Sequence, residues 1–76
     1  MKDLLSFIIN KITGTGDFTI AETEEGERVI FEVKAKKEII GLIIGREGKT
    51  IKNIRKILSV PAVLSHKGIA INVTET

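Results

Sequence analysis

The chain has 76 residues, no cysteine, and 12 lysines and arginines against 10 aspartates and glutamates. This length predicts one small domain, and the lack of cysteine excludes disulfides and thiolate metal sites. No apolar run approaches the roughly 18 residues that span a membrane, and the N-terminus lacks the apolar segment of a signal peptide. We therefore expect a cytoplasmic protein without membrane insertion.

Charge is distributed unevenly along the chain. Residues 1–35 carry four Lys/Arg against seven Asp/Glu, a balance of −3, and residues 36–76 carry eight against three, a balance of +5. A modest total with this polarity indicates a partner such as RNA at one edge of the molecule, and not a protein that wraps nucleic acid on all sides.

The N-terminal half of the chain is predicted to form a helix and a hairpin. Residues 3–12 place Leu4, Leu5, Ile8, Ile9 and Ile12 at helical spacing, with Phe7 beside them, and the glycines at 14 and 16 end the helix. Residues 17–23 and 28–35 alternate apolar and polar side chains, which predicts two antiparallel strands joined by a turn at 24–27. The acids around this turn indicate a solvated hairpin tip, because their spacing resembles no metal-binding loop.

Residues 36–44 are predicted to form a short helix with more apolar residues than one packing face requires. We expect Ile40 and Ile43 to be buried and Gly41 to allow close helix packing. The surplus apolar side chains are available for the floor of a groove.

A second helix is predicted from Lys49 to at least Leu58, and Pro61 is expected to end or kink it. Residues 62–64 then add an irregular turn or serve a partner interface. His66 lies in a turn without a second catalytic or metal-binding group, and residues 69–73 alternate as a closing strand.

The two predicted helices flank Gly45-Arg46-Glu47-Gly48. Glycine permits positive φ and places no Cβ in the way of a ligand backbone. If the next helix starts at Lys49 or Thr50, its free N–H groups and positive dipole end face this loop. On that helix an apolar stripe opposes a cationic one; the apolar members are Ile51, Ile54, Ile57 and Leu58, and the cationic members are Lys49, Lys52, Arg55 and Lys56.

A basic stripe alone indicates only a solvated face. The glycine loop at its start shifts the interpretation toward an anion-binding edge.

The run Ile43-Ile44-Gly45-Arg46-Glu47-Gly48-Lys49-Thr50-Ile51 resembles the signature of the KH domain, an RNA-binding module with a GxxG loop. The order helix, strand, strand, helix, GxxG, helix, strand is similar to the type II KH domain. That resemblance implies an α+β fold of order α-β-β-α-α-β, with a three-stranded mixed sheet packed against three helices and one KH domain over residues 1–76. The size, the start at Met1 and the lack of appended domains most resemble the free-standing bacterial KH proteins of the KhpA (YlqC-like) family.

The resemblance also implies a site for about four single-stranded nucleotides in a narrow groove. The loop residues Gly45, Arg46, Glu47 and Gly48 would pack on the sugar-phosphate backbone, with Glu47 pointing outward. The phosphate charge would come from Arg46, Lys49 and Lys52, followed along the cationic stripe by Arg55 and Lys56. The apolar surface under the bases would be Ile40, Ile44 and Ile51, and residues 69–74 would offer edge groups to the bases.

The three phenylalanines are expected on core faces of the N-terminal helix and hairpin, so stacking platforms near the loop are absent. We therefore expect one copy to bind RNA weakly, and useful affinity to need a dimer or a second RNA-binding partner.

Enzyme functions fit this sequence poorly. Gly48-Lys49-Thr50 resembles the end of a Walker phosphate loop, but the first glycine of that pattern falls at position 43, which is isoleucine. Without a Ser-His-Asp set or a metal cluster we expect no enzyme and no cofactor.

The remaining alternative is a protein-interaction module. The resembled family implies self-association and pairing with a larger Jag-like RNA-binding protein linked to cell elongation and division. As an RNA-binding protein, the chain would be a post-transcriptional regulator or RNA chaperone.

Overall fold

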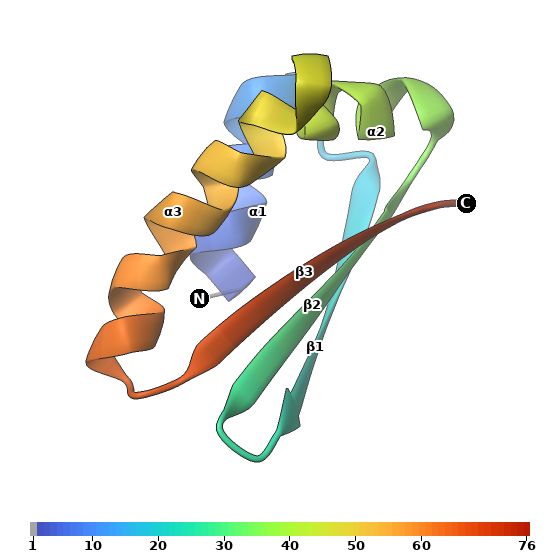
Figure 1. The fold of residues 1–76 in the computed structure, drawn as a ribbon. Helices are drawn as coiled ribbons and strands as arrows, with labels where there is room; N and C mark the ends of the chain where they lie inside the picture. The colour runs from blue at the N-terminus through green and yellow to red at the C-terminus, as the bar shows by residue number, and fades with distance from the viewer. Residues whose placement is uncertain (1) are drawn as a thin grey trace.

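The computed structural model of the chain describes residues 2–76 (Figure 1). Met1, where the expected domain begins, lies outside these residues. The elements are α1 (Lys2–Thr13), β1 (Phe18–Glu25), β2 (Arg28–Ala35), α2 (Lys37–Ile44), a 3-10 turn η1 (Arg46–Gly48), α3 (Lys49–Leu64) and β3 (Gly68–Glu75). This is the α-β-β-α-α-β order of the type II KH fold, as the sequence predicted.

The sheet has the order β1-β2-β3, with β2 antiparallel to β1 and parallel to β3. The three helices lie against one of its faces (Figure 1). The hairpin turn is shorter than predicted, because Glu24 and Glu25 belong to β1 and pair with Val29 and Arg28. Gly26, with φ of 62°, supplies the positive φ that a two-residue hairpin turn needs. The mixed three-stranded sheet is therefore confirmed.

The core forms where β2 meets the three helices. Alternate residues of β2 are buried, as its period of two predicted. Each fully buried aliphatic or aromatic side chain contributes about 1.5–3 kcal/mol relative to an exposed one. The fully packed cluster consists of Leu5, Ile9, Val29, Phe31, Val33, Ile43, Ile54, Leu58 and Ile71.

The prediction that Phe7 faces the core is wrong. Its side chain is 60% exposed, and the Lys11 Nζ atom lies 5.5 Å from the ring centroid. Helix α1 buries the face that carries Leu5 and Ile9, and Phe7 lies about 160° around the helix from Ile9. Phe31 is fully buried, and Phe18 is half-buried against the core.

Helix α3 continues past Pro61 to Leu64, so the prediction that it ends or kinks near Val60 is wrong in its boundary. The reason is packing: Ala62 is buried and extends the stripe begun by Ile54 and Leu58 at intervals of four residues. Pro61 cannot donate to the Ile57 carbonyl, but Ile57 is 48% exposed, so water can reach this part of the helix.

The end of α3 is closed by hydrogen bonds from the following turn. The Lys67 N–H donates to the Ala62 carbonyl at 2.8 Å, and the His66 N–H donates to the Val63 carbonyl at 3.0 Å. His66 has φ of 56°, the left-handed conformation that this arrangement requires after a helix. His66 therefore has a structural role that the sequence interpretation did not assign.

Three smaller predictions about the helices are also corrected. Ile57 belongs to the predicted apolar stripe of α3 but is half exposed, because it lies at the margin of the buried face. Ile40 is only half-buried, and its neighbour Ile39 packs against the core instead. Gly41 is exposed, and a Cβ built there meets nothing within 4 Å, so it mediates no close helix packing.

Candidate nucleic-acid interface

The loop between α2 and α3 has a backbone that its glycines make possible. Gly45 has φ of 75° and ψ of 177°, a region that is essentially restricted to glycine. Gly48 is left-handed with φ of 75° and ψ of 14°, and Glu47 is left-handed with φ of 56° and ψ of 25°. Arg46 and Glu47 at the tip are exposed, whereas the two glycines are half-buried. The loop therefore presents its tip to solvent.

Hydrogen bonds within the loop hold this shape. The Gly45 N–H donates to the Gly41 carbonyl at 2.9 Å, and the Gly48 N–H donates to the Gly45 carbonyl at 3.2 Å. The Lys49 N–H donates to the Arg46 carbonyl. The sequence predicted free N–H groups at this helix start, and those of Gly48 and Lys49 instead have partners within the loop. Side-chain cations would therefore carry more of any phosphate contact.

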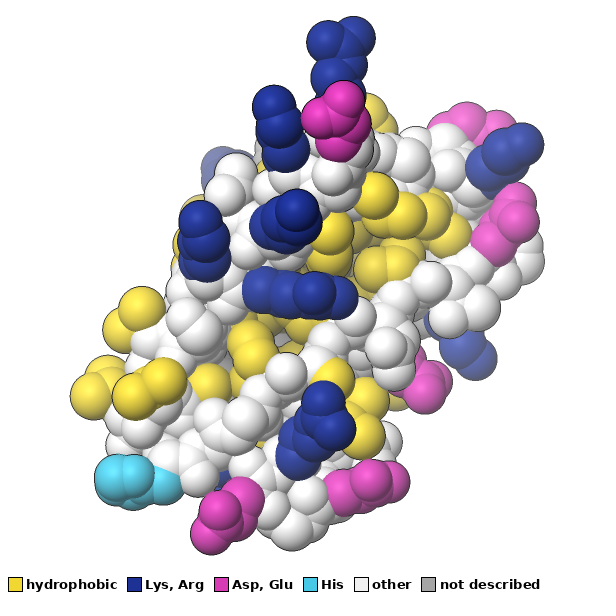
Figure 2. All heavy atoms as spheres, in the orientation of Figure 1, with side chains coloured by type: hydrophobic (Ala, Val, Ile, Leu, Met, Phe, Trp, Pro, Cys, Tyr) yellow, Lys and Arg dark blue, Asp and Glu magenta, His cyan; other side chains and the backbone are white. Residues whose placement is uncertain are grey.

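All four basic side chains on the first half of α3 are exposed. At about 100° per residue, Arg55 lies nearest the buried face, Lys52 follows about 60° further out, and Lys49 and Lys56 lie beyond it. Figure 2 shows Lys and Arg side chains following α3 along the rim of a hollow whose surface is apolar. Lys52 and Arg55 are the members of the stripe that lie closest to this hollow.

The hollow lies between α3, α2 and β3 (Figure 2). The three apolar residues predicted to lie under the bases remain accessible to different degrees: Ile44 is exposed, and Ile40 and Ile51 are half-buried. Ile51 also packs against the core, which fixes its position. On α2, Ile40 and Ile44 share one flank, because residues four apart are about 40° apart around the helix.

Further along the same side, the edge of β3 lines a hollow of about 310 Å³. Its walls are Arg28, Arg55, Ile69, Ala70, Ile71 and Asn72. Arg55 and the strand were predicted as parts of the site, but Arg28 was not. Its nearness to Arg55 depends on the parallel pairing that places Arg28 opposite Gly68, and no local sequence pattern reports that register.

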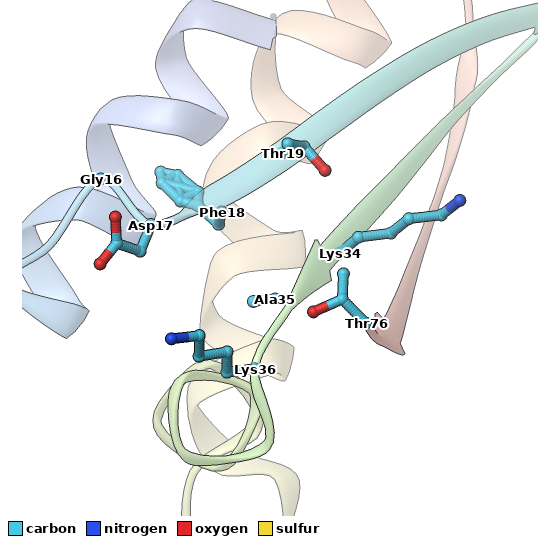
Figure 3. Close-up of a pocket in the computed structure, with 8 residues that line it drawn as sticks. All are labelled: Gly16, Asp17, Phe18, Thr19, Lys34, Ala35, Lys36 and Thr76. Carbon is cyan, nitrogen blue, oxygen red and sulfur yellow. The ribbon is translucent and has the colours of Figure 1, made fainter.

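Another hollow, of about 370 Å³, lies where β1 begins and β2 ends (Figure 3). Its lining includes Phe18, Lys36 and Asp17, and the Lys34 side chain extends away from it (Figure 3). It shares no residue with the loop or with α3. Within residues 2–76 no group of acids or histidine is placed to hold a metal ion, and no helix has the length and apolarity needed to cross a bilayer.

Comparison with known proteins identifies relatives over almost the whole chain. A family model described as KhpA/KhpB, KH domain, matches residues 2–74. The RNA-binding protein KhpA of Chlamydia caviae is 36% identical over 76 residues, covering 99% of this chain and 97% of that protein. The RNA-binding protein KhpA of Chlamydia pneumoniae is 34% identical with the same coverage.

A third relative matches a shorter part of the chain. The RNA-binding protein KhpA of Thermotoga maritima is 32% identical over 60 residues, covering 78% of this chain and 80% of that protein. No solved structure matches the chain significantly. The family match, the full-length relatives and the GxxG loop between α2 and α3 agree: this chain belongs to the KhpA/KhpB family of KH domains.

Proposed function

We propose that this protein binds short single-stranded RNA in the hollow between the GxxG loop, α2, α3 and β3. The observation that carries the proposal is the exposed loop of positive-φ residues at the start of a helix with a cationic face and an apolar hollow beside it. RNA backbone approaches such a loop closely because glycine carries no side chain. The relatives named RNA-binding protein KhpA support the same function.

In this proposal each group has a separate task. The side chains of Arg46, Lys49 and Lys52 neutralise phosphates, and Arg55 and Lys56 extend the positive field along α3. Ile40, Ile44 and Ile51 offer apolar surface to the bases. Three phosphate contacts give a salt dependence of about −2 in log K against log salt, at about −0.7 per phosphate for single strands.

A single copy is expected to bind weakly. None of the three phenylalanines belongs to α2, the loop, α3 or β3. Base stacking on aromatic side chains, which contributes about 1–3 kcal/mol per base elsewhere, is therefore not provided by the elements around the hollow.

The test is a charge reversal at the loop tip. Arg46→Asp combined with Glu47→Asp makes the tip acidic without changing the glycines or the core, because both side chains are exposed. We expect RNA crosslinking to fall at least about tenfold, since a repelled phosphate replaces an attracted one. Unfolding temperature is expected to stay within a few degrees.

Lys2→Asp is the matched control, because it makes the same change of two charge units at an exposed position at the start of α1. It should leave crosslinking near the wild-type level. Crosslinking retained by the loop variant, or lost equally in the control, would show that RNA binds another surface or responds only to total charge.

We further propose that the protein self-associates, because α3 carries an exposed apolar face near its end. Ile57, Val60 and Leu64 are 48%, 62% and 78% exposed and lie within about 60° around the helix. Exposed apolar faces of this kind favour burial against another protein. A dimer would place two weak RNA sites in one particle and raise the apparent affinity.

The alternative occupant of this face is a larger Jag-like RNA-binding protein. Sedimentation velocity of the purified chain distinguishes the two. Val60→Lys with Leu64→Lys should convert a dimer to a monomer, whereas Leu42→Lys, at a 51% exposed apolar position on α2, should not. A wild-type chain that is monomeric at high concentration contradicts self-association and leaves the larger protein as the candidate.

For the whole chain we propose a non-catalytic role in the cytoplasm, where RNA is available, with residues 1–76 acting as one KH domain. A post-transcriptional regulator or RNA chaperone would use the site in this way. The crosslinked RNAs, once sequenced, identify the target.

A further inference from the structure

We propose that Arg28 is an additional RNA-binding residue, which holds a phosphate where the RNA leaves the loop and passes along the free edge of β3. This inference rests on the proposed RNA-binding function and extends it. It makes the binding site longer than the four nucleotides that one KH groove holds.

The free edge of β3 is the first observation. In the order β1-β2-β3, strand β3 pairs only with β2, so one of its edges has no strand partner within residues 2–76. An edge strand presents unpaired backbone N–H and C=O groups. Residues 69–72 line the hollow of about 310 Å³ at this edge.

Arg28 and Arg55 reach this hollow from different elements. Arg55 comes from α3, on the side of the sheet that the helices cover. Arg28 starts from the opposite face, because the next residue, Val29, is buried beneath the helices and successive strand residues alternate between faces. The two guanidinium groups therefore bracket the edge of β3.

Both arginines are available for an anion. Among residues 2–76 the one salt bridge joins Lys67 Nζ to Glu24 Oε2 at 2.9 Å, and neither Arg28 nor Arg55 takes part in one. Glu25, which lies opposite Arg28 in the hairpin register, forms no ion pair with it. A guanidinium offers five N–H donors in a planar fork that matches two oxygens of a phosphate.

The position of these arginines relative to the loop gives the direction of the RNA. Lys49 and Arg55 are six residues apart on α3, a rise of about 9 Å. Lys and Arg side chains continue from the loop down α3 and onto the lower part of the sheet, beside the apolar hollow (Figure 2). An RNA strand held at the loop and running toward the hairpin end of the sheet therefore meets Arg55 and then Arg28.

An acidic peptide added to β3 as a fourth strand is the competing occupant of this edge. The continuous row of cations from the loop favours RNA. A peptide paired along β3 would leave the cations on the first turns of α3 without an anionic partner.

The test compares two lengths of RNA on isotope-labelled protein by NMR. Randomised oligoribonucleotides of roughly four nucleotides, the length that one KH groove holds, should shift the amide signals of residues 45–48 and leave that of Arg28 unchanged. Oligoribonucleotides of roughly twelve nucleotides should also shift the amide signal of Arg28. Arg28→Ala should weaken binding of the longer RNA about three- to tenfold, lower its salt slope by about 0.7, and leave the shorter RNA unaffected.

Lys34→Ala is the matched control, because it removes a cation from the same strand at an exposed position outside this hollow. Arg28→Lys keeps the charge but loses the fork, and it should give an intermediate loss with the longer RNA. This second variant also keeps the test valid if the alanine variant proves unstable.

Equal affinity of Arg28→Ala and wild type for the longer RNA, with the loop signals still shifting, would overturn the role of Arg28 and leave the proposed function intact. No shift at the loop with either length would overturn the proposed function itself. A glutamate-rich peptide that shifts residues 69–72 where the longer RNA does not would assign the edge to a protein partner.

Discussion

Gly45 lies directly against the side chain of Thr50, across the start of α3. A Cβ built on Gly45 would lie 2.6 Å from the Thr50 Cβ, closer than two non-bonded carbon atoms approach, and 3.0 Å from the Thr50 backbone nitrogen, at the tight end of real contacts. Gly48 differs, because the atom nearest to a Cβ there is Ile51 Cγ2 at 4.0 Å. The two glycines of the loop are thus required for different reasons.

We predict that Gly45→Ala destabilises the fold more than Gly48→Ala. At Gly48 the cost is that of a left-handed alanine, about 1–2 kcal/mol. At Gly45 the clash with Thr50 adds to a backbone conformation that is essentially restricted to glycine, so helix α3 has to shift. Urea unfolding of the two variants measures the difference, and equal losses would show that packing against Thr50 is unimportant.

His66→Gly is expected to raise the free energy of unfolding by about 1 kcal/mol. His66 occupies the left-handed position after α3, where glycine carries no Cβ penalty. His66→Ala is the control, because it removes the imidazole but keeps the Cβ, and it should give no such gain. If both variants were destabilised alike, the imidazole itself would be holding the turn.

Pro61→Ala is expected to stabilise the protein by about 1–2 kcal/mol. Alanine restores the N–H that can donate to the Ile57 carbonyl and removes a residue that costs about 3 kcal/mol in a helix interior. The larger number of unfolded conformations open to alanine offsets part of this gain. The shift in urea midpoint tests it, and a loss of stability would mean that the proline ring contributes packing.

Phe7→Ala should cost less than about 1 kcal/mol of unfolding free energy, because the ring is mostly exposed. Phe31→Ala should cost about 3–5 kcal/mol, because the ring is fully buried in the centre of the sheet. Thermal unfolding of both variants makes the comparison. A large loss at Phe7 would indicate that α1 is covered by another chain in solution.

The strands were predictable where burial imposed a period of two. Strand β2 was predicted with its bounds intact, since Val29, Phe31, Val33 and Ala35 alternate with polar or less buried residues. The position of the GxxG loop was predictable for a related reason, because its two glycines separate two strongly patterned helices.

The wrong predictions concern burial and helix boundaries that tertiary contacts determine. Hydropathy alone cannot show which flank of α1 the other helices cover, so Phe7 was placed in the core. The rule that proline ends a helix is local, and the burial of Ala62 overrode it. Arg28 was not predicted to line the hollow at the edge of β3, because Arg55, which lines it as well, comes from α3, far away in sequence.

The parallel pairing of β2 with β3 also affects when the candidate RNA-binding site forms during folding. From Arg28 with Gly68 to Ala35 with Glu75, every pair joins residues 40 positions apart in the chain. Contacts of such long range form slowly, and during translation they must wait until β3 has left the ribosome. The nascent chain therefore exposes its glycine loop before β3 has paired with β2. Until then the strand that would line the proposed RNA site is not in place.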